Sequence, residues 1–182
     1  SKGFTKLVRI QNGEFKPPKM LKLNKTSSKS GTTDVQFNPS YYNILASTTL
    51  LNNQIIIWDI DQCNLNKLST NIGQHDQLVN RVSWNPINPK LLASCSQDGY
   101  IKIFDFIGTK GEVLSMNHRD KVRDCQFSPF NEHLLLASYS GVVKLWDTRD
   151  TTRSVQDFYK HEADVLSIDW NPINKDIFIC KI

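Results

Sequence analysis

The sequence predicts an all-β fold built from one antiparallel unit that recurs along the chain. It holds three short apolar runs, at residues 79–84, 91–95 and 100–106, which are rich in β-branched and aromatic residues and too short for helices. Asn85-Pro86 follows the first run, and Asp98-Gly99 precedes the third. Asp-Gly between β-rich runs favours a tight hairpin, because glycine takes a positive φ without steric cost. This segment is therefore predicted to form a small antiparallel meander.

The repetition is visible in two kinds of residue. A histidine recurs at intervals of 43 residues, as His75, His118 and His161. An aromatic residue followed by aspartate ends a predicted strand in three places, as Trp58-Asp59, Phe104-Asp105 and Trp146-Asp147. A period of roughly 40–45 residues with a terminal Trp-Asp pair is typical of WD40 repeats. The chain thus resembles the WD40 β-propellers, and the resemblance implies antiparallel four-stranded blades.

Two regions are expected along the chain. Residues 1–30 contain two predicted strands, which fit the outer strands of a preceding blade, and a basic polar loop. Residues 31–182 contain the WD40 repeats, about three blades and the start of a fourth. Propellers typically close with 4–8 blades, so we expect a partial or open propeller. The sequence leaves open whether the chain is a fragment of a longer protein or a half-propeller that a partner completes.

The composition of the chain indicates its cellular compartment. No apolar run approaches the length of a membrane span, and the first residues lack the apolar segment of a signal peptide. The cysteines contain no C-x-x-C pair; they are Cys63, Cys95, Cys125 and Cys180. We therefore expect a reducing compartment, the cytoplasm or the cytosolic surface of a membrane. The net charge of +4 combines a basic stretch at residues 1–30 with a mildly acidic remainder.

The resemblance to WD40 proteins implies a structural hydrogen-bond network in each blade, made by histidine, serine, aspartate and tryptophan. Its implied members are His75, Ser94 and Asp98 in the second repeat, His118, Ser138 and Trp146 in the third, and Ser47 and Trp58 in the first. The network satisfies buried polar groups, which are costly when unpaired. No repeat has all four residues: Phe104 replaces the tryptophan in the second, and the third has a shortened turn without the aspartate.

A serine, a histidine and an aspartate in one repeat also raise the possibility of a hydrolase. No nucleophile elbow or oxyanion-hole motif accompanies them, so the structural interpretation is favoured. The three recurring histidines fall on separate blades, and no cysteine lies at a metal-ligand interval from them. The sequence therefore predicts no enzyme activity, no small-molecule substrate, no metal and no cofactor.

Three surface features are candidates for partner binding. The resemblance implies a binding rim at one end of the propeller, formed by Leu78, Asn80, Gln97, Lys121, Arg123 and Asp164. The competing interpretation is that these are solvated loop ends. A row of lysines could attract an anionic partner, but a solvated loop is favoured; it comprises Lys16, Lys19, Lys22, Lys25 and Lys29. The sequence argues against nucleic-acid binding, because only Phe15 offers a stacking surface among these charges.

The third feature is a W-D-x-R sequence at residues 146–149. It resembles the box by which some WD40 proteins dock onto adaptors of cullin-4 ubiquitin ligases, which would make the chain a substrate receptor that docks through Arg149. The alternative is a surface arginine that pairs with Asp147 or Asp150. The box normally has the aspartate turn upstream, which is shortened here.

Within the WD40 proteins, several stretches resemble one subunit more closely, namely FKPPKMLKLNK, TTDVQFNP, SQDGYIKIFD, VKLWDTR and HEADVLSIDWNP. It is the WD-repeat subunit of the SEA complex, the second GATOR complex of animals, that carries a RING domain at its far end. The resemblance implies a scaffold in nutrient signalling to the target-of-rapamycin kinase, with other proteins as partners. It also implies a cytoplasmic location, at the vacuolar or lysosomal surface and touching the membrane only through those partners. The RING domain is absent from these 182 residues.

Overall fold

The structure is a computed structural model, and it describes residues 31–50, 52–61, 69–108 and 111–182, together with the backbone of four short strands before residue 22. These strands form two antiparallel pairs. β1 (Thr5–Leu7) pairs with β4 (Lys19–Leu21), and β2 (Ile10–Gln11) pairs with β3 (Glu14–Phe15). The predicted lysine row lies outside the described residues, apart from the backbone of Lys19. The assignment of residues 1–30 to a preceding blade stays a prediction.

Three four-stranded antiparallel sheets and one two-stranded sheet follow, each a simple meander. We call them blades 1 to 4. Blade 1 contains β5 (Val35–Phe37), β6 (Ile44–Thr48), β7 (Gln54–Asp59) and β8 (Ser69–Gln74). Blade 2 contains β9 (Val79–Trp84), β10 (Leu91–Ser96), β11 (Tyr100–Asp105) and β12 (Gly111–Asn117). Blade 3 contains β13 (Asp124–Phe127), β14 (Leu134–Ser138), β15 (Ser140–Asp147) and β16 (Gln156–Asp164). Blade 4 contains β17 (Ser167–Trp170) and β18 (Phe178–Lys181).

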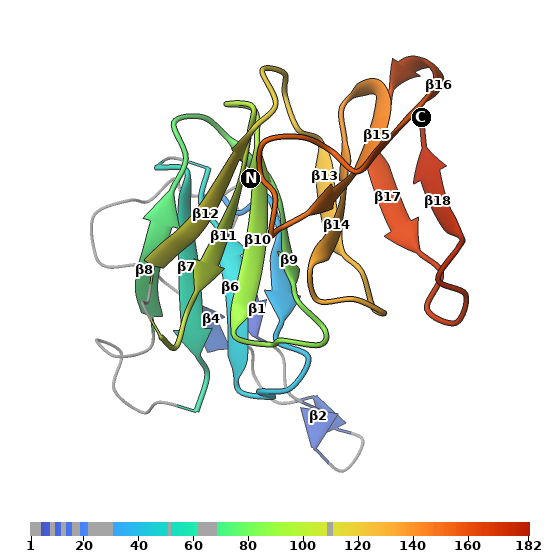
Figure 1. The fold of residues 1–182 in the computed structure, drawn as a ribbon. Helices are drawn as coiled ribbons and strands as arrows, with labels where there is room; N and C mark the ends of the chain where they lie inside the picture. The colour runs from blue at the N-terminus through green and yellow to red at the C-terminus, as the bar shows by residue number, and fades with distance from the viewer. Residues whose placement is uncertain are drawn as a thin grey trace.

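The blades stand side by side in chain order, with β17 and β18 at one end of the row (Figure 1). The predicted all-β fold of antiparallel propeller blades is confirmed, as is its partial, open form. The described residues form no helix, and so none of them belongs to a helix that could cross a bilayer.

Most of the core lies between the blades, and one further apolar cluster, of Leu45, Ile56, Trp58 and Ile60, lies within blade 1. One apolar cluster joins blades 1 and 2, a second joins blades 2 and 3, and a third joins blades 3 and 4. Strands covered on both faces need apolar side chains in continuous runs, not in alternation. Residues 55–58 of β7 are therefore all buried, in the sequence Ile-Ile-Ile-Trp.

Apolar side chains are exposed at both ends of this row. In blade 1 the exposure is limited to β5, since Leu45, Ile56 and Trp58 on the same face are each 2% exposed. Val35 and Phe37 of β5 are 46% and 55% exposed, whereas Val82 and Trp84, their counterparts in blade 2, are 0% and 5% exposed. At the other end, Ile179 of β18 is 67% exposed. These side chains have the apolar character of the buried seams, but the described residues place no further blade against them.

Candidate functional site

The polar network of blade 2 is formed around His75, which directly follows β8. His75 Nδ1 lies 2.8 Å from Asp98 Oδ2, and His75 Nε2 lies 2.7 Å from Ser94 Oγ. With its proton on Nδ1, the imidazole donates to Asp98 and accepts from Ser94. Burial raises the pKa of Asp98, but the hydrogen bond with His75 outweighs burial and lowers that pKa to about 2.

This Ser-His-Asp arrangement is closed to solvent. Ser94 is 0% exposed and His75 is 3% exposed, so a substrate has no access to the hydroxyl. The Asp98 carboxylate also accepts the backbone N–H groups of Asp76 and Tyr100, at 3.0 and 2.9 Å. The network therefore ties the segment before β9 to the hairpin between β10 and β11.

Blade 1 contains the other half of the same network. Trp58 Nε1 donates to Ser47 Oγ over 2.8 Å, and both side chains are 2% exposed. Ser47 pairs with Ile56 across the β6–β7 ladder, while Trp58 pairs with Leu45. The tryptophan therefore reaches diagonally to the serine on the neighbouring strand, which blade 2 cannot do because Phe104 has no N–H.

In blade 3 the implied network is not formed, and the assignment of Ser138 to it is wrong. His118 Nε2, Ser138 Oγ and Trp146 Nε1 are buried without a hydrogen-bond partner. The register explains why. Ser94 pairs with Val82, and the residue that pairs at the same place in blade 3 is Ala137, opposite Cys125. Ser138 is one residue further along and so lies on the opposite face of the sheet.

Aromatic packing takes the place of hydrogen bonds around His118. Its ring lies 4.4 Å from that of Trp146, edge to face, and 4.7 Å from that of Tyr139. Burial lowers the pKa of His118 to about 3, so the imidazole is neutral near pH 7. Burial raises the pKa of Tyr139 well above its ordinary value, and the nearby Trp146 indole opposes that rise. The hydroxyl and indole nevertheless fall short of hydrogen-bond geometry.

Blade 4 carries a variant of the network that sequence reasoning missed. His161 Nε2 lies 3.3 Å from Cys180 Sγ. Cys180 pairs with Ile168 as Ser94 pairs with Val82, so a thiol occupies the serine position. A signal was present in the sequence: Cys180 follows Asn171 by the same interval at which Ser94 follows Asn85.

Side chains of one blade also bond the inner strand of the next. Because β9, β13 and β17 are sheet edges, some of their N–H groups have no partner within their own sheet. Carboxylate, hydroxyl or amide oxygens of the preceding blade accept them. The pairs are Val82 N to Asp34 Oδ2 (3.0 Å), Phe127 N to Ser83 Oγ (3.2 Å), Ile168 N to Asp124 Oδ2 (2.9 Å) and Trp170 N to Gln126 Oε1 (2.8 Å).

Arg81 extends this inner edge into an ionic row. It occupies in blade 2 the position that Asp34 and Asp124 occupy in blades 1 and 3. Its Nε atom lies 3.7 Å from Asp34 Oδ2 and 3.4 Å from Asp124 Oδ1. Burial raises the pKa of Asp124 above its ordinary value, against the lowering effect of the Ile168 N–H and of Arg81. Sequence reasoning did not identify these contacts, because they join residues more than forty positions apart.

The rim residues implied by the resemblance lie near the starts of the inner strands and bond mostly to one another. Asn80 Nδ2 donates to the Val122 carbonyl over 2.6 Å, and Gln97 Nε2 lies 3.5 Å from Asn80 Oδ1. The Leu78 carbonyl accepts the Gln97 N–H. Arg123 pairs with Asp164 at 2.5 Å, and this hydrogen bond lowers the pKa of Asp164. Lys121 is exposed. A partner-binding role for this rim stays a prediction.

A hollow lies at the opposite ends of the same inner strands. Residues of all four blades line it: Gln36, Ser83, Trp84, Pro86, Gln126, Phe127, Pro129, Asp169, Trp170 and Pro172. Its proline rings come from the turns that follow β9, β13 and β17. The four inner strands therefore form a shared surface with a polar, mixed-charge end and a proline-rich end.

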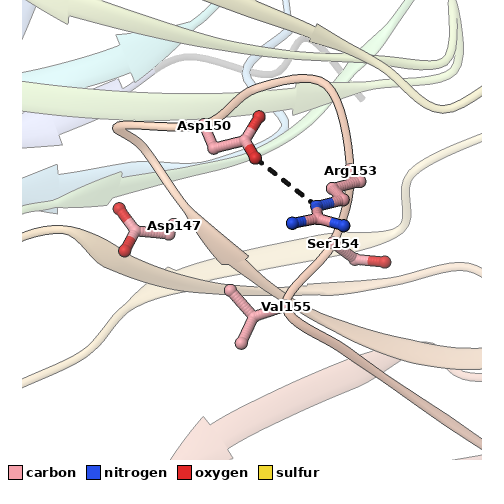
Figure 2. A pocket seen from close by; sticks show the side chains of 5 residues that line it. All are labelled: Asp147, Asp150, Arg153, Ser154 and Val155. Carbon is pink, nitrogen blue, oxygen red and sulfur yellow. Dashed lines mark ion pairs between the residues drawn. The ribbon is translucent and has the colours of Figure 1, made fainter.

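The arginine of the W-D-x-R sequence is held by its own neighbour. Arg149 donates to Asp147 through Nε and a terminal nitrogen, at 2.9 and 2.5 Å. This hydrogen bond lowers the pKa of Asp147 to about 2. The pairing with Asp147 is one of the two alternatives that the sequence left open. An exposed hollow adjoins Asp147, and Figure 2 shows Arg153 pointing toward Asp150 across it.

No group of three or more His, Cys, Asp or Glu side chains within the described ranges is arranged to hold a metal ion. The recurring histidines instead stand in three different blade seams, with a serine and an aspartate, with two aromatic rings, and with a thiol.

Sequence comparison fits this geometry. The WD40 family, described as WD domain, G-beta repeat, matches residues 66–105 and 111–147. The matched segments end with the Phe104-Asp105 and Trp146-Asp147 pairs and contain the inner three strands of blades 2 and 3. The chain is built from WD40 repeats. The resemblance drawn from the histidine and Trp-Asp spacing is thereby confirmed.

Proteins whose names refer to the GATOR2 complex are similar to most of this chain. GATOR2 complex protein WDR24 of Danio rerio is 32% identical over 149 residues, covering 81% of this chain and 19% of that protein. WDR24 of Homo sapiens is 30% identical over 170 residues, covering 92% and 21%. GATOR2 complex protein WDR59 of Gallus gallus is 26% identical over 143 residues, covering 78% and 14%. The WD40 chain thus spans about a fifth of the WDR24 proteins that it matches, and the expected similarity to a GATOR-type WD-repeat subunit is confirmed.

Proposed function

We propose that this WD40 chain is a non-catalytic scaffold that binds other proteins as part of a GATOR2-type complex in nutrient signalling to the target-of-rapamycin kinase. The names of its WDR24 and WDR59 relatives support the assignment to that complex. The burial of His75 and Ser94 supports a structural role for the Ser-His-Asp group. A cytoplasmic location, at the vacuolar or lysosomal surface through its partners, is part of the same proposal.

The observation that carries the proposal is the set of exposed apolar side chains at the two ends of the row, on β5 and on blade 4. Val35 and Phe37 are about half exposed at positions that are buried in blade 2. Leu166, Ile177 and Ile179 are likewise exposed in blade 4, at 51%, 46% and 67%. Contiguous apolar surface and unpaired sheet edges favour association with other protein. Such faces are suited to contact a further β-blade or another subunit.

Co-purification with defined subunits tests this proposal. The tagged chain would be co-expressed with the other subunits of a GATOR2 complex, and the mass of the purified product measured by light scattering. We expect a stable assembly. Val35→Glu with Phe37→Glu should abolish it, because two charges would enter an apolar contact. The matched control is Val113→Glu, on outer strand β12, where the side chain is 39% exposed.

Two results would contradict the proposal. The first is an unmodified chain that remains a monomer beside those subunits at micromolar concentration. The second is equal loss of assembly in the Val113→Glu control, which would show that the added charge acts on folding rather than on a binding face. Far-ultraviolet circular dichroism of each variant separates folding from binding.

A further inference from the structure

Cys180 and His161 form a thiol–imidazole pair at the seam between blades 3 and 4. Cys180 belongs to β18 and His161 to β16, and their Sγ and Nε2 atoms lie 3.3 Å apart. The separation of 19 residues is the same as between His75 and Ser94. The blade register places the thiol where blades 1 and 2 have serine hydroxyls. A thiol beside an imidazole therefore stands where those blades have a hydroxyl.

The surroundings of this thiol differ from those of the other described cysteines. Cys95 and Cys125 are 0% and 1% exposed and lie within the apolar cluster between blades 2 and 3. Burial, followed by the hydrogen bond with Cys125, raises the pKa of Cys95 well above its ordinary value. Such thiols are inert, because the thiolate is the reactive form. Cys180 is half-buried and packs against the cluster between blades 3 and 4.

We propose that Cys180 is a modification site that reacts with hydroperoxides, with His161 as the base that accepts its proton. In this reaction the thiol proton passes to His161 Nε2, and the thiolate attacks one peroxide oxygen. The S–O bond forms as the O–O bond breaks. Sulfur is oxidised by two electrons to a sulfenic acid. The leaving hydroxide, or the alkoxide of an organic hydroperoxide, takes the imidazolium proton to become water or an alcohol. This inference is independent of the proposed assembly function.

The position of the thiol gives the modification a structural consequence. The Cys180 side chain packs with Leu136, Val143, Val165 and Ile168, which belong to blade 3, blade 4 and the segment joining them. A sulfenic acid adds a polar oxygen to this seam and alters the hydrogen bond between Cys180 Sγ and His161 Nε2. Because a sulfenic acid is reduced by thiols, the change is reversible. The oxidised form should hold blade 4 less firmly against blade 3.

Peptide-resolved labelling tests the proposal on the full 182-residue chain. The chain is treated with hydrogen peroxide at pH 7 in the presence of dimedone, which traps sulfenic acids, and each cysteine is quantified by mass spectrometry. The same chain in urea gives the rate of each unperturbed thiol. We expect folded Cys180 to react about tenfold faster than unfolded Cys180, because few free thiols are ionised at this pH. Folded Cys95 and Cys125 should react more slowly than their unfolded forms.

Substitution of the base separates activation from exposure. His161→Gln should lower the rate at Cys180 to that of the unfolded thiol. The protection of the strand, measured by hydrogen exchange at residues 178–181, should stay unchanged. The matched control is His133→Gln, at a 41% exposed histidine whose Nε2 lies 3.9 Å from Glu132 Oε1; it should retain the full rate. If His161→Gln perturbs the fold, the ratio of folded to unfolded rates in the unsubstituted chain still decides the question.

Either of two outcomes would overturn the proposal. One is a folded Cys180 that reacts no faster than the unfolded thiol. The other is a rate in folded His161→Gln that lies within twofold of the unsubstituted chain, which would make exposure alone responsible. In the first case His161 and Cys180 form only a structural hydrogen bond, as His75 and Ser94 do.

Discussion

The Asp124 carboxylate of blade 3 accepts the backbone N–H of Ile168, the first buried residue of the blade 4 inner strand, over 2.9 Å. The Asp124 side chain is 3% exposed, and it also accepts a hydrogen bond from the Ser167 hydroxyl at 3.0 Å. A strand edge that would otherwise leave a buried N–H unsatisfied is thus completed by the neighbouring blade.

Removal of this acceptor should weaken the seam between blades 3 and 4. We expect Asp124→Ala to lower the free energy of unfolding by about 1–3 kcal/mol, the cost of leaving a buried donor unsatisfied. Asp124→Asn keeps an acceptor oxygen and should cost less. Urea unfolding followed by tryptophan fluorescence measures both. Equal losses in the two variants would show that charge, and not the hydrogen bond, is what matters.

The acid stability of the chain should depend on Asp98. Its pKa is about 2 in the folded chain, against an ordinary value of 3.8. Because folding lowers the pKa, the ionised carboxylate stabilises the fold above pH 3.8, and this contribution is lost as the pH falls toward 2. Asp98→Asn should therefore flatten the unfolding free energy across that window, measured by urea titration at successive pH values.

Asp147 is the control for that experiment, because its pKa is also about 2. Its partner Arg149 is 66% exposed, so salt should screen their interaction, whereas the covered His75–Asp98 pair should respond little. If the unfolding free energy of Asp98→Asn changes with pH as steeply as that of the unsubstituted chain, Asp98 does not cause the acid sensitivity.

Ala137→Ser should restore the missing hydroxyl of blade 3. Ala137 holds the register position of Ser47, and Trp146 Nε1 is buried without an acceptor. A serine there can accept from the indole as Ser47 accepts from Trp58, and one such bond is worth about 1 kcal/mol. The measured quantity is the urea midpoint. Ser138→Ala should lower the unfolding free energy little, because that hydroxyl has no hydrogen-bond partner to lose.

Gly141 is required at the shortened turn of blade 3. Its φ is +69°, and a Cβ added there would lie 2.7 Å from the His161 carbonyl oxygen. Both the backbone conformation and the clash with backbone disfavour any other residue. We expect Gly141→Ala to lower the unfolding free energy by about 1–3 kcal/mol. Gly108→Ala, where the nearest atom is the end of the Asp105 side chain, should cost less in the same thermal or urea assay.

Arg149→Ala tests the alternative of a cullin-4 ligase receptor. Since Arg149 is already paired with Asp147, we expect the substitution to leave binding to the subunits of a GATOR2 complex unchanged. A pull-down with a purified cullin-4 adaptor tests the receptor function directly. Adaptor binding by the unsubstituted chain that Arg149→Ala removes would favour the receptor function.

The strands were predictable from sequence because each is marked locally. The runs at 79–84, 91–95 and 100–106 correspond to β9, β10 and β11 within one residue at each end, since turn residues and β-branched side chains set their limits. The His75–Ser94–Asp98 contacts also have the arrangement that the resemblance implied.

Two features lay beyond sequence reasoning. Ser138 was matched to Ser94 by residue type. Side chains alternate between the two faces of a strand, so a shift of one residue places Ser138 on the opposite face. The inner-edge contacts of Asp34, Ser83, Asp124 and Gln126 join different repeats, so no local pattern marks them. Cys180 could have been recognised by counting from Asn171, but its significance depends on the approach of His161.

The edge contacts between blades have a direction. Each inner strand is completed by side chains of the blade before it, as Asp34 completes β9 and Asp124 completes β17. The stability of the row is then close to a sum of terms for single blades and for adjacent pairs, as in other linear repeat arrays. Opening should start at a terminal blade and advance one seam at a time, and a lesion in one seam should leave distant seams intact.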